Sequence, residues 1–270
     1  MVLQAKRERI RSLRRLKMDW PLYAMMLFPV ALVFVFNYIP LVGIVIAFEN
    51  YMPAKGILGS QFTGFKNFET LFNMPGFYQA IRNTLTMSFW KIALGIVVPI
   101  MFTLLLNEMQ SAAIRRTVQT LIYLPHFVSW ILLAGIFTRL LSSSGIVNRM
   151  LNSLGISSII FLGDNKWFPF TIISTHIWKE FGYGTIVYLA AIAGIDPTLY
   201  EAAEVDGAGR WQQIRAVTLP TLLPMMGLML ILNMGTVLNT NFEQIYNLYS
   251  PQVYSTGDII DTLVYRIGLE

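Results

Sequence analysis

Long apolar runs alternate with short polar segments along the whole chain. A helix needs ~20 mostly apolar residues to cross a membrane. Five runs approach or exceed this length, and they are Tyr23–Phe48, Thr84–Leu106, Val118–Leu141, Phe168–Ala193 and Leu222–Leu238. The last is the shortest, and Leu219-Pro220 can extend it. The pattern predicts an all-α protein that crosses the membrane several times.

Composition agrees with this class. Hydrophobic residues make up 55% of the chain and charged residues 13%, whereas soluble domains are about 25% charged. The first apolar run is too long for the core of a signal peptide, and no small-residue cleavage site follows it, so we expect a retained span. The chain has no cysteine, which excludes disulfides and thiolate metal sites. The only histidines, His126 and His176, lack ligand-type spacing, and no metal site is expected.

Basic residues indicate the orientation. Lys and Arg are enriched in Met1–Asp19, Asn107–Thr117 and Gly194–Thr218 relative to Glu49–Ile81 and Ser142–Trp167. Cytoplasmic segments carry this excess, so we expect a multi-pass cell-membrane protein with a cytoplasmic amino terminus. The densest cluster could suggest nucleic acid, but beside a span it favours topology and contact with anionic membrane lipid. Its members are Lys6, Arg7, Arg9, Arg11, Arg14, Arg15 and Lys17.

The polar segment between the fourth and fifth runs has helix boundaries of its own. Asp196-Pro197 is a helix start, and Asp206-Gly207 is a turn that should end that helix. Arg210 to Val217 can form a second short helix, after which Leu219-Pro220 opens the last apolar run. The segment predicts a compact cytoplasmic docking element, and the alternative is a solvated connector.

Residues of this segment resemble a known motif. Glu201-Ala202-Ala203, Gly207 and Val217-x-Leu219-Pro220 are similar to the EAA loop of permease subunits in binding-protein-dependent ABC importers. Val217 stands where the family pattern has Ile. Weaker matches point to sugar permeases and to the LplB-like oligosaccharide branch, and they are Gly64 to Phe68, Tyr123-Leu124-Pro125, Phe242 to Tyr246, Asp261-Thr262 and Tyr265-Arg266.

The resemblance implies a fold. It is the helical bundle of the ABC importer type-1 permease (MetI-like) class, with a sixth span expected after Tyr265-Arg266 and absent from this sequence. The implied organisation is a basic cytoplasmic tail over residues 1–19, a first span with an extracytoplasmic loop over 20–78, and the permease domain over 79–270. Phe65, Phe68 and Phe72 within that loop predict a short helix, lying on the membrane surface or docking a partner.

The resemblance also implies a mechanism. The chain would form part of the path of an ATP-driven carbohydrate importer, with a second homologous permease, a cytoplasmic ABC ATPase dimer and an extracytoplasmic sugar-binding (lipo)protein. Glu201 would pair with a basic residue of the ATPase, Ala202 and Ala203 would keep the helix thin, and Gly207 would permit the reversal. Val217, Leu219 and Pro220 would anchor the loop to the following span.

No catalytic function is expected. The sequence lacks a Gly-x-x-x-x-Gly-Lys-Ser/Thr stretch, so ATP would be hydrolysed by the partner and no cofactor bound by this chain. No nucleophile–base or metal constellation suggests an intramembrane enzyme. A passive channel or structural subunit would need no docking loop.

Polar residues in or near the spans are candidates for the substrate path. They are Lys179, Glu180, Tyr183, Asn233, Asn239, Asn241 and Glu243, with Trp178 and Tyr246 as further suitable types and Lys91 as another intramembrane charge. Lys179 and Glu180 project about 100° apart on a helix, so we expect separate partners rather than a direct pair. The partner permease could supply those partners, and Asn233 could instead bond between helices.

Overall fold

The computed structural model describes residues 19–238 and 242–269. The chain divides into two compact units, Met1–Met74 and Pro75–Glu270. Regular structure in the described residues is helical except for one pair of two-residue strands. The all-α class expected from the apolar runs is confirmed.

The first unit begins with a continuous helix from Asp19 to Phe48. At 30 residues it exceeds the ~20 that a span needs, and its most apolar stretch is unburied in the described structure. The helix widens to a π-turn at η1 (Phe34–Tyr38) and tightens to a 3₁₀-helix at η2 (Ile39–Phe48). Pro40 lies just after the π-turn; it has no N–H to donate, and the altered turns accommodate it.

A small hairpin and a short helix complete this unit. Strand β1 (Glu49–Asn50) pairs antiparallel with β2 (Gln61–Phe62), and α2 (Gly56–Gly59) lies between them. The expected aromatic helix is present as α3 (Lys66–Phe72). Its aromatic face packs locally, because the rings of Phe65 and Phe68 lie 5.6 and 5.2 Å from that of Phe48.

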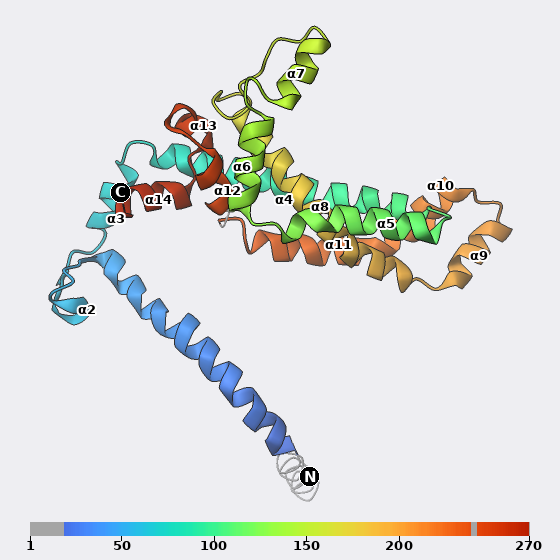
Figure 1. The fold of residues 1–270 in the computed structure, drawn as a ribbon. Helices are drawn as coiled ribbons and strands as arrows, with labels where there is room; N and C mark the ends of the chain where they lie inside the picture. Colours follow the sequence, from blue (N-terminus) through green and yellow to red (C-terminus); the bar gives the residue numbers. More distant parts are fainter. Residues whose placement is uncertain (1–18, 239–241, 270) are drawn as a thin grey trace, which may run out of the picture. The chain divides into compact units, whose positions relative to one another are not determined.

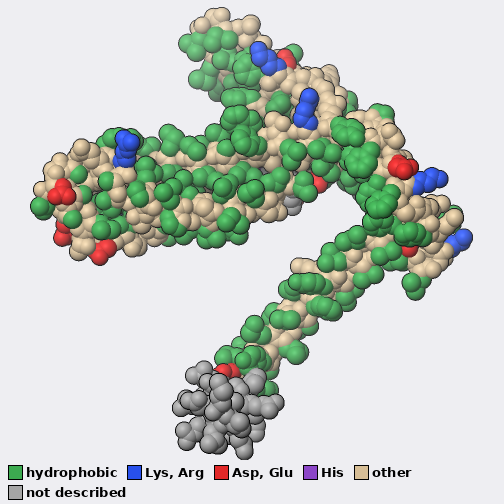
Figure 2. Space-filling model, turned by 180° about the vertical axis from the view of Figure 1, so that it is seen from behind, with side chains coloured by type: hydrophobic (Ala, Val, Ile, Leu, Met, Phe, Trp, Pro, Cys, Tyr) green, Lys and Arg blue, Asp and Glu red, His purple; other side chains and the backbone are tan. Residues whose placement is uncertain are grey.

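Four helices of the second unit lie side by side in Figure 1. They are α4 (Phe77–Asn107), α5 (Ala112–Tyr123), α8 (Phe168–Ala193) and α11 (Leu219–Met234). Hydrophobic side chains cover the face of this bundle shown in Figure 2, and charged side chains gather at the end where α9 (Pro197–Val205) and α10 (Arg210–Gln213) lie. This distribution suits a bundle whose sides face lipid and whose end meets water.

Two clusters of buried side chains hold the bundle together. One lies next to the polar segment and contains Ile100, Tyr188, Ile192, Ile195 and Leu222. The other joins the bundle to the carboxyl-terminal helices and contains Met87, Ala134, Phe168, Ile172, Ile245, Leu248, Val253 and Ile259.

The third expected span, Val118–Leu141, is present as two helices separated by a sharp break. The chain forms Ala112–Phe127 and then α6 (Trp130–Leu140), which are bent by 103° relative to each other. The 3₁₀-turn η3 (Leu124–Phe127) contains Pro125, and Ser129 caps the new helix by accepting from the Leu132 amide. A window of hydropathy cannot register this break, because the residues on both sides are apolar.

The remaining expected spans are present as helices with shifted ends. By length and composition three single helices can cross a membrane, namely Asp19–Phe48, Phe77–Asn107 and Arg210–Met234, and up to five if each of two bent pairs is one span. The second bent pair is Phe168–Ala193 with Pro197–Val205, at 71°.

The carboxyl-terminal region forms short helices on the bundle. They are α12 (Phe242–Leu248), η5 (Pro251–Val253), α13 (Tyr254–Gly257) and α14 (Ile260–Leu269). Earlier in the chain, a further short helix, α7 (Ile146–Ser153), follows α6.

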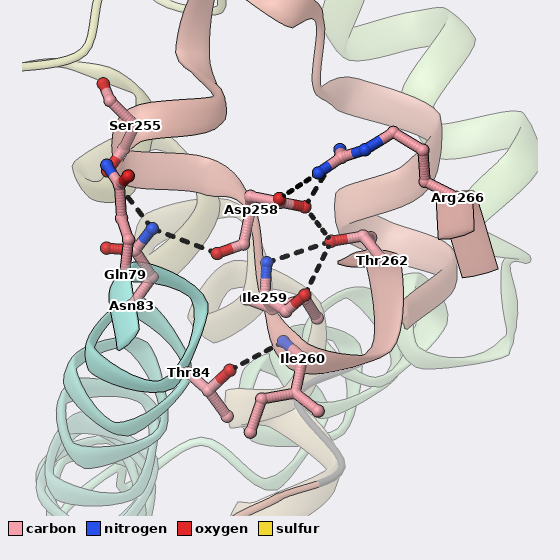
Figure 3. A network of polar contacts seen from close by, with 9 residues as sticks. All are labelled: Gln79, Asn83, Thr84, Ser255, Asp258, Ile259, Ile260, Thr262 and Arg266. Carbon is pink, nitrogen blue, oxygen red and sulfur yellow. Dashed lines mark hydrogen bonds and ion pairs between the residues drawn. The ribbon is translucent and has the colours of Figure 1, made fainter. Parts of the chain in front are cut away.

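Side chains of α4 fasten this region to the bundle (Figure 3). Asn83 Nδ2 donates to the carbonyl oxygens of Asp258 (3.0 Å) and Ser255 (3.3 Å), and Thr84 Oγ1 accepts from the Ile260 amide (3.0 Å). These contacts satisfy backbone groups in the turn between α13 and α14, where no helix satisfies them.

Candidate functional site

The polar segment folds as its boundary residues predict. Helix α9 (Pro197–Val205) starts with Pro197 at its first position, and Asp196 accepts from the Thr198 amide at 3.0 Å. Gly207 has φ +77° and its amide donates to the Glu204 carbonyl at 2.9 Å. This left-handed conformation is costly for residues with a Cβ, so glycine permits the reversal after α9.

The second short helix of this segment is not separate from the last span. Helix α10 (Arg210–Gln213) continues through a π-turn, η4 (Ile214–Thr218), into α11, so that Arg210–Met234 is one 25-residue helix. As at Pro40, the π-turn lies just before a proline, Pro220, which cannot donate a helical hydrogen bond.

The segment is anchored at its base. Val217 and Leu219 pack against the buried cluster around Leu222, and the hydroxyls of Tyr200 and Thr218 are hydrogen-bonded at 2.9 Å. Pro220 is exposed in the described structure, and its part in the anchor stays a prediction.

The outward face of the segment is solvent-accessible. Glu201 and Ala202 are exposed and Ala203 is partly buried. Sequence reasoning missed two apolar side chains nearby, Val205 and Trp211, which are 88% and 71% exposed. Their apolar character within a polar loop was the available signal. Large exposed apolar side chains beside a carboxylate suit a protein contact.

The carboxylate of Asp196 gives α9 a pH dependence. The hydrogen bond from the Thr198 amide holds the pKa of Asp196 below its ordinary value. The cap therefore contributes its full stabilisation of α9 above the unfolded-state pKa of about 3.9, and this stabilisation is lost as the pH falls through the lower folded-state pKa.

We expect the Thr198 amide to lose protection from hydrogen exchange in that acidic range, after correction for intrinsic rates. Asp196→Asn should keep the cap and lose this pH dependence; an unchanged profile would contradict the assignment.

A cavity of about 510 Å³ opens between the helices of the bundle. Three of the predicted substrate-path residues line it, namely Glu180, Tyr183 and Asn233. Its other walls come from Ser88, Lys91, Ile92 and Gly95 of α4, His176, Gly184, Val187 and Tyr188 of α8, Met229 of α11, and Thr236 and Val237 after it. The volume is within the range of small-molecule sites.

The expectation that Lys179 and Glu180 do not pair is wrong. Lys179 Nζ lies 3.1 Å from Glu180 Oε1 and donates to the carbonyl oxygen of His126 at 2.6 Å. Glu180 Oε2 lies 2.7 Å from Nδ1 of His126, whose ring stacks on that of Tyr183 at 4.1 Å. Both side chains turn toward the break between α5 and α6, where they meet. Rotation about the helix alone did not account for the length of the lysine side chain.

The other predicted path residues do not meet at the cavity. Lys179 is buried beside it without lining it, and Glu243 is exposed on α12. Trp178 packs edge-on against Phe137, with ring centroids 5.6 Å apart. Asn239 and Asn241 lie outside the described residues. Asn233 lines the cavity, and its side-chain amide donates to the Met229 carbonyl of its own helix at 2.8 Å. Its side-chain oxygen can still accept a hydrogen bond.

Sequence reasoning missed the polar contacts of Lys91. Lys91 Nζ donates to Gln244 Oε1 at 2.9 Å, and Gln244 donates to the Ile172 carbonyl at 2.7 Å and to Thr175 Oγ1 at 3.0 Å. The contacts tie α4, α8 and α12 together. They join residues far apart in the sequence, and the only early signal was a lysine within an apolar run.

Known proteins resemble this chain over most of its length. Residues 91–242 match the family described as "Binding-protein-dependent transport system inner membrane component". The polygalacturonan/rhamnogalacturonan transport system permease protein YteP of Bacillus subtilis (strain 168) is 41% identical over 270 residues, which are 100% of this chain and 84% of that protein. Protein LplB of the same organism is 39% identical over 255 residues, covering 94% and 80%.

A solved structure shares the fold. It belongs to a bacterial alginate ABC transporter in complex with alginate pentasaccharide-bound periplasmic protein, and it superposes with a TM-score of 0.85 at 43% identity, covering 95% of this chain and 85% of the other. The family match includes the whole segment from Glu201 to Pro220 and all described cavity residues except Ser88. The resemblance seen in that segment is confirmed, and the chain belongs to the family of binding-protein-dependent transport system inner membrane components.

Proposed function

We propose that this chain is a membrane permease subunit of an ATP-driven carbohydrate importer. The observation that carries the proposal is one continuous helix, Arg210–Met234, which begins in the exposed polar segment and reaches the cavity at Met229. An external protein that displaces the segment would therefore move a wall of the cavity. The names of the similar proteins refer to polygalacturonan, rhamnogalacturonan and alginate, which supports a carbohydrate as the substrate.

The exposed face of the segment is the proposed contact for a cytoplasmic ABC ATPase dimer. Glu201 offers a carboxylate to a basic residue of that partner, while Val205 and Trp211 offer apolar surface. Glu108 and Arg210 form an ion pair at 2.8 Å that ties the segment to the end of α4. The segment would then move with the bundle as a unit, and rigid-body rotation of the helices would expose the cavity alternately to the two sides.

Further partners complete the transporter. A second homologous permease would cover the open side of the cavity, and an extracytoplasmic sugar-binding protein would deliver the substrate. The distribution of Lys and Arg supports an amino terminus and a Glu201 segment on the cytoplasmic side. The chain lacks a phosphate-binding stretch, so ATP hydrolysis is assigned to the separate ATPase.

Charge reversal at Glu201 tests the coupling. In proteoliposomes containing the whole transporter, Glu201→Arg should weaken ATPase binding about tenfold, equivalent to about 1.4 kcal/mol, and reduce ATP-driven uptake of carbohydrate accordingly. The matched control is Glu69→Arg, because Glu69 is also an exposed carboxylate on a short helix but lies in the first unit. Unchanged ATPase binding and uptake in Glu201→Arg would show that the segment is only a connector.

A further inference from the structure

Helix α7 and the residue that ends it have one apolar and one polar side. At about 100° per residue, the apolar side chains fall within one arc of about 140°, and they are Ile146, Val147, Met150, Leu151 and Leu154. The polar side chains fill the opposite arc, and they are Asn148, Arg149, Asn152 and Ser153. So complete a division in a short helix indicates that its two sides meet different surroundings.

The polar arc of α7 faces the protein itself. Asn148 is fully buried, and its Nδ2 donates to the carbonyl oxygens of Ser142 and Ile159, each at 2.9 Å. Its Oδ1 accepts from the Ile159 amide at 2.7 Å, and Asn152 Nδ2 donates to Ser158 Oγ at 3.1 Å. These bonds tie α7 by its polar side to the segments before and after it. The usual arrangement of a surface helix, with its apolar side inward, is therefore reversed.

The apolar arc of α7 is left open in the described structure. Ile146, Met150 and Leu154 follow one another at intervals of four residues, which places them along one side of the helix. Their side chains are 52%, 63% and 75% exposed. A contiguous row of large exposed aliphatic side chains is typical of a surface that contacts a partner or a membrane.

The chemistry around the row favours lipid over a protein partner. Figure 1 shows α7 projecting from the bundle beyond α6, away from α9 and α10. Exposed aliphatic side chains continue the row on both sides, at Ile136 of α6 and at Ile156 and Ile160 after α7. Protein interfaces favour Trp, Tyr and complementary charges, whereas Arg149 is the only charged residue between Ser142 and Gly163. Aliphatic side chains beside one exposed cation suit acyl chains and phosphate head groups.

We propose that α7 lies on the membrane surface, with Ile146, Met150 and Leu154 in the boundary of the acyl chains and Arg149 against anionic head groups. The inference goes beyond the proposed function, because it concerns neither the carbohydrate nor the ATPase. Asn148 holds the row toward the lipid, and the contact anchors the connection between α6 and α8 to the bilayer while the bundle moves.

Introduced cysteines test the placement of the two arcs. The chain has no cysteine, so a thiol placed on α7 is the only one that this chain offers to a water-soluble maleimide. The whole transporter is held in lipid nanodiscs of phosphatidylcholine and phosphatidylglycerol, and each rate is divided by the rate after denaturation. We expect Met150→Cys and Leu154→Cys to react about tenfold more slowly than the matched control Asn152→Cys, because apolar surroundings disfavour the reactive thiolate.

The composition of the nanodiscs tests Arg149. Without phosphatidylglycerol, the protection of Met150→Cys should fall about fivefold, the equivalent of about 1 kcal/mol for one basic residue near an anionic surface. Adding Arg149→Gln should remove this dependence on the lipid. Equal protection in both kinds of nanodisc would overturn the assignment of Arg149 to the head groups.

The remaining outcomes concern the occupant of the row. Equal rates for Met150→Cys and Asn152→Cys would overturn the proposal, since the two arcs would then share one environment. Protection of Met150→Cys that arises only on adding the carbohydrate-binding protein, or only with the second permease present, would also overturn it and assign the row to a protein contact. Leu154→Cys is read in the same way if Met150→Cys does not assemble.

Discussion

Replacing Gly182 by alanine is expected to destabilise the bundle by about 2–3 kcal/mol, the upper part of the range for overpacked cores. A Cβ at this position would lie 1.9 Å from the carbonyl oxygen of Ile122 and 2.4 Å from its carbonyl carbon. Those atoms belong to the backbone of α5, so no side-chain rotation can relieve the clash. Helices α5 and α8 would have to separate, and the contacts of His126 with Lys179 and Glu180 would weaken with them.

Denaturant titration of the protein in detergent measures this effect. The matched control is Gly227→Ala on α11, where an added Cβ meets nothing within 4 Å, and which should be neutral or stabilising because alanine favours helix. A Gly182→Ala protein as stable as the Gly227→Ala protein would show that α5 and α8 do not pack this closely. Transport should fall with stability, since α8 lines the cavity.

The second large effect is expected from Arg266→Met. Asp258 has a side chain only 8% exposed, and its Oδ2 lies 2.5 Å from Nη2 of Arg266, while Oδ1 accepts from Thr262 at 2.7 Å. The hydrogen bond to Asp258 raises the pKa of Arg266, which stays charged. Removing the arginine leaves a buried carboxylate without its cation, and breaking such a pair costs about 3–5 kcal/mol.

The loss should be local to the carboxyl-terminal helices. Hydrogen exchange of the Ile259 and Ile260 amides, which bond to Thr262 and Thr84 (Figure 3), should accelerate strongly in Arg266→Met. Arg149→Met, at an exposed arginine of α7, should have no such effect. Adding Asp258→Asn to Arg266→Met should restore part of the protection because it removes the stranded charge. If the double variant exchanges as fast as the single one, the ion pair is not what holds this turn.

Local signals predicted the polar segment well. The start of α9 at Asp196-Pro197 and the reversal at Gly207 depend on capping and backbone conformation, which a few neighbouring residues determine. The sequence analysis divided the helix Arg210–Met234 into a short helix and a separate span, which is wrong. Leu219-Pro220 resembles a helix start, but the π-turn before it keeps the helix continuous.

The cavity was only partly predictable. Hydropathy identified the helices, and rare polar residues within them identified Glu180, Tyr183 and Asn233. The sequence could not show that Lys179 and Glu180 meet at His126, or that Lys91 meets Gln244, because these contacts depend on how distant segments pack. A proline within the third apolar run suggests a kink near Pro125, but the sequence did not show that the chain breaks there into two helices bent by 103°.

The single helix that begins at Arg210 has a geometrical consequence for transport. From Trp211 to Asn233 it measures about 33 Å at 1.5 Å per residue. A tilt of about 6° around its lower end would displace the Asn233 end by roughly 3 Å, about the length of one hydrogen bond. A displacement of this size is enough to form or break a hydrogen bond between the helix and a bound sugar. Under the proposed mechanism, release of the sugar would therefore not require the bundle to unfold.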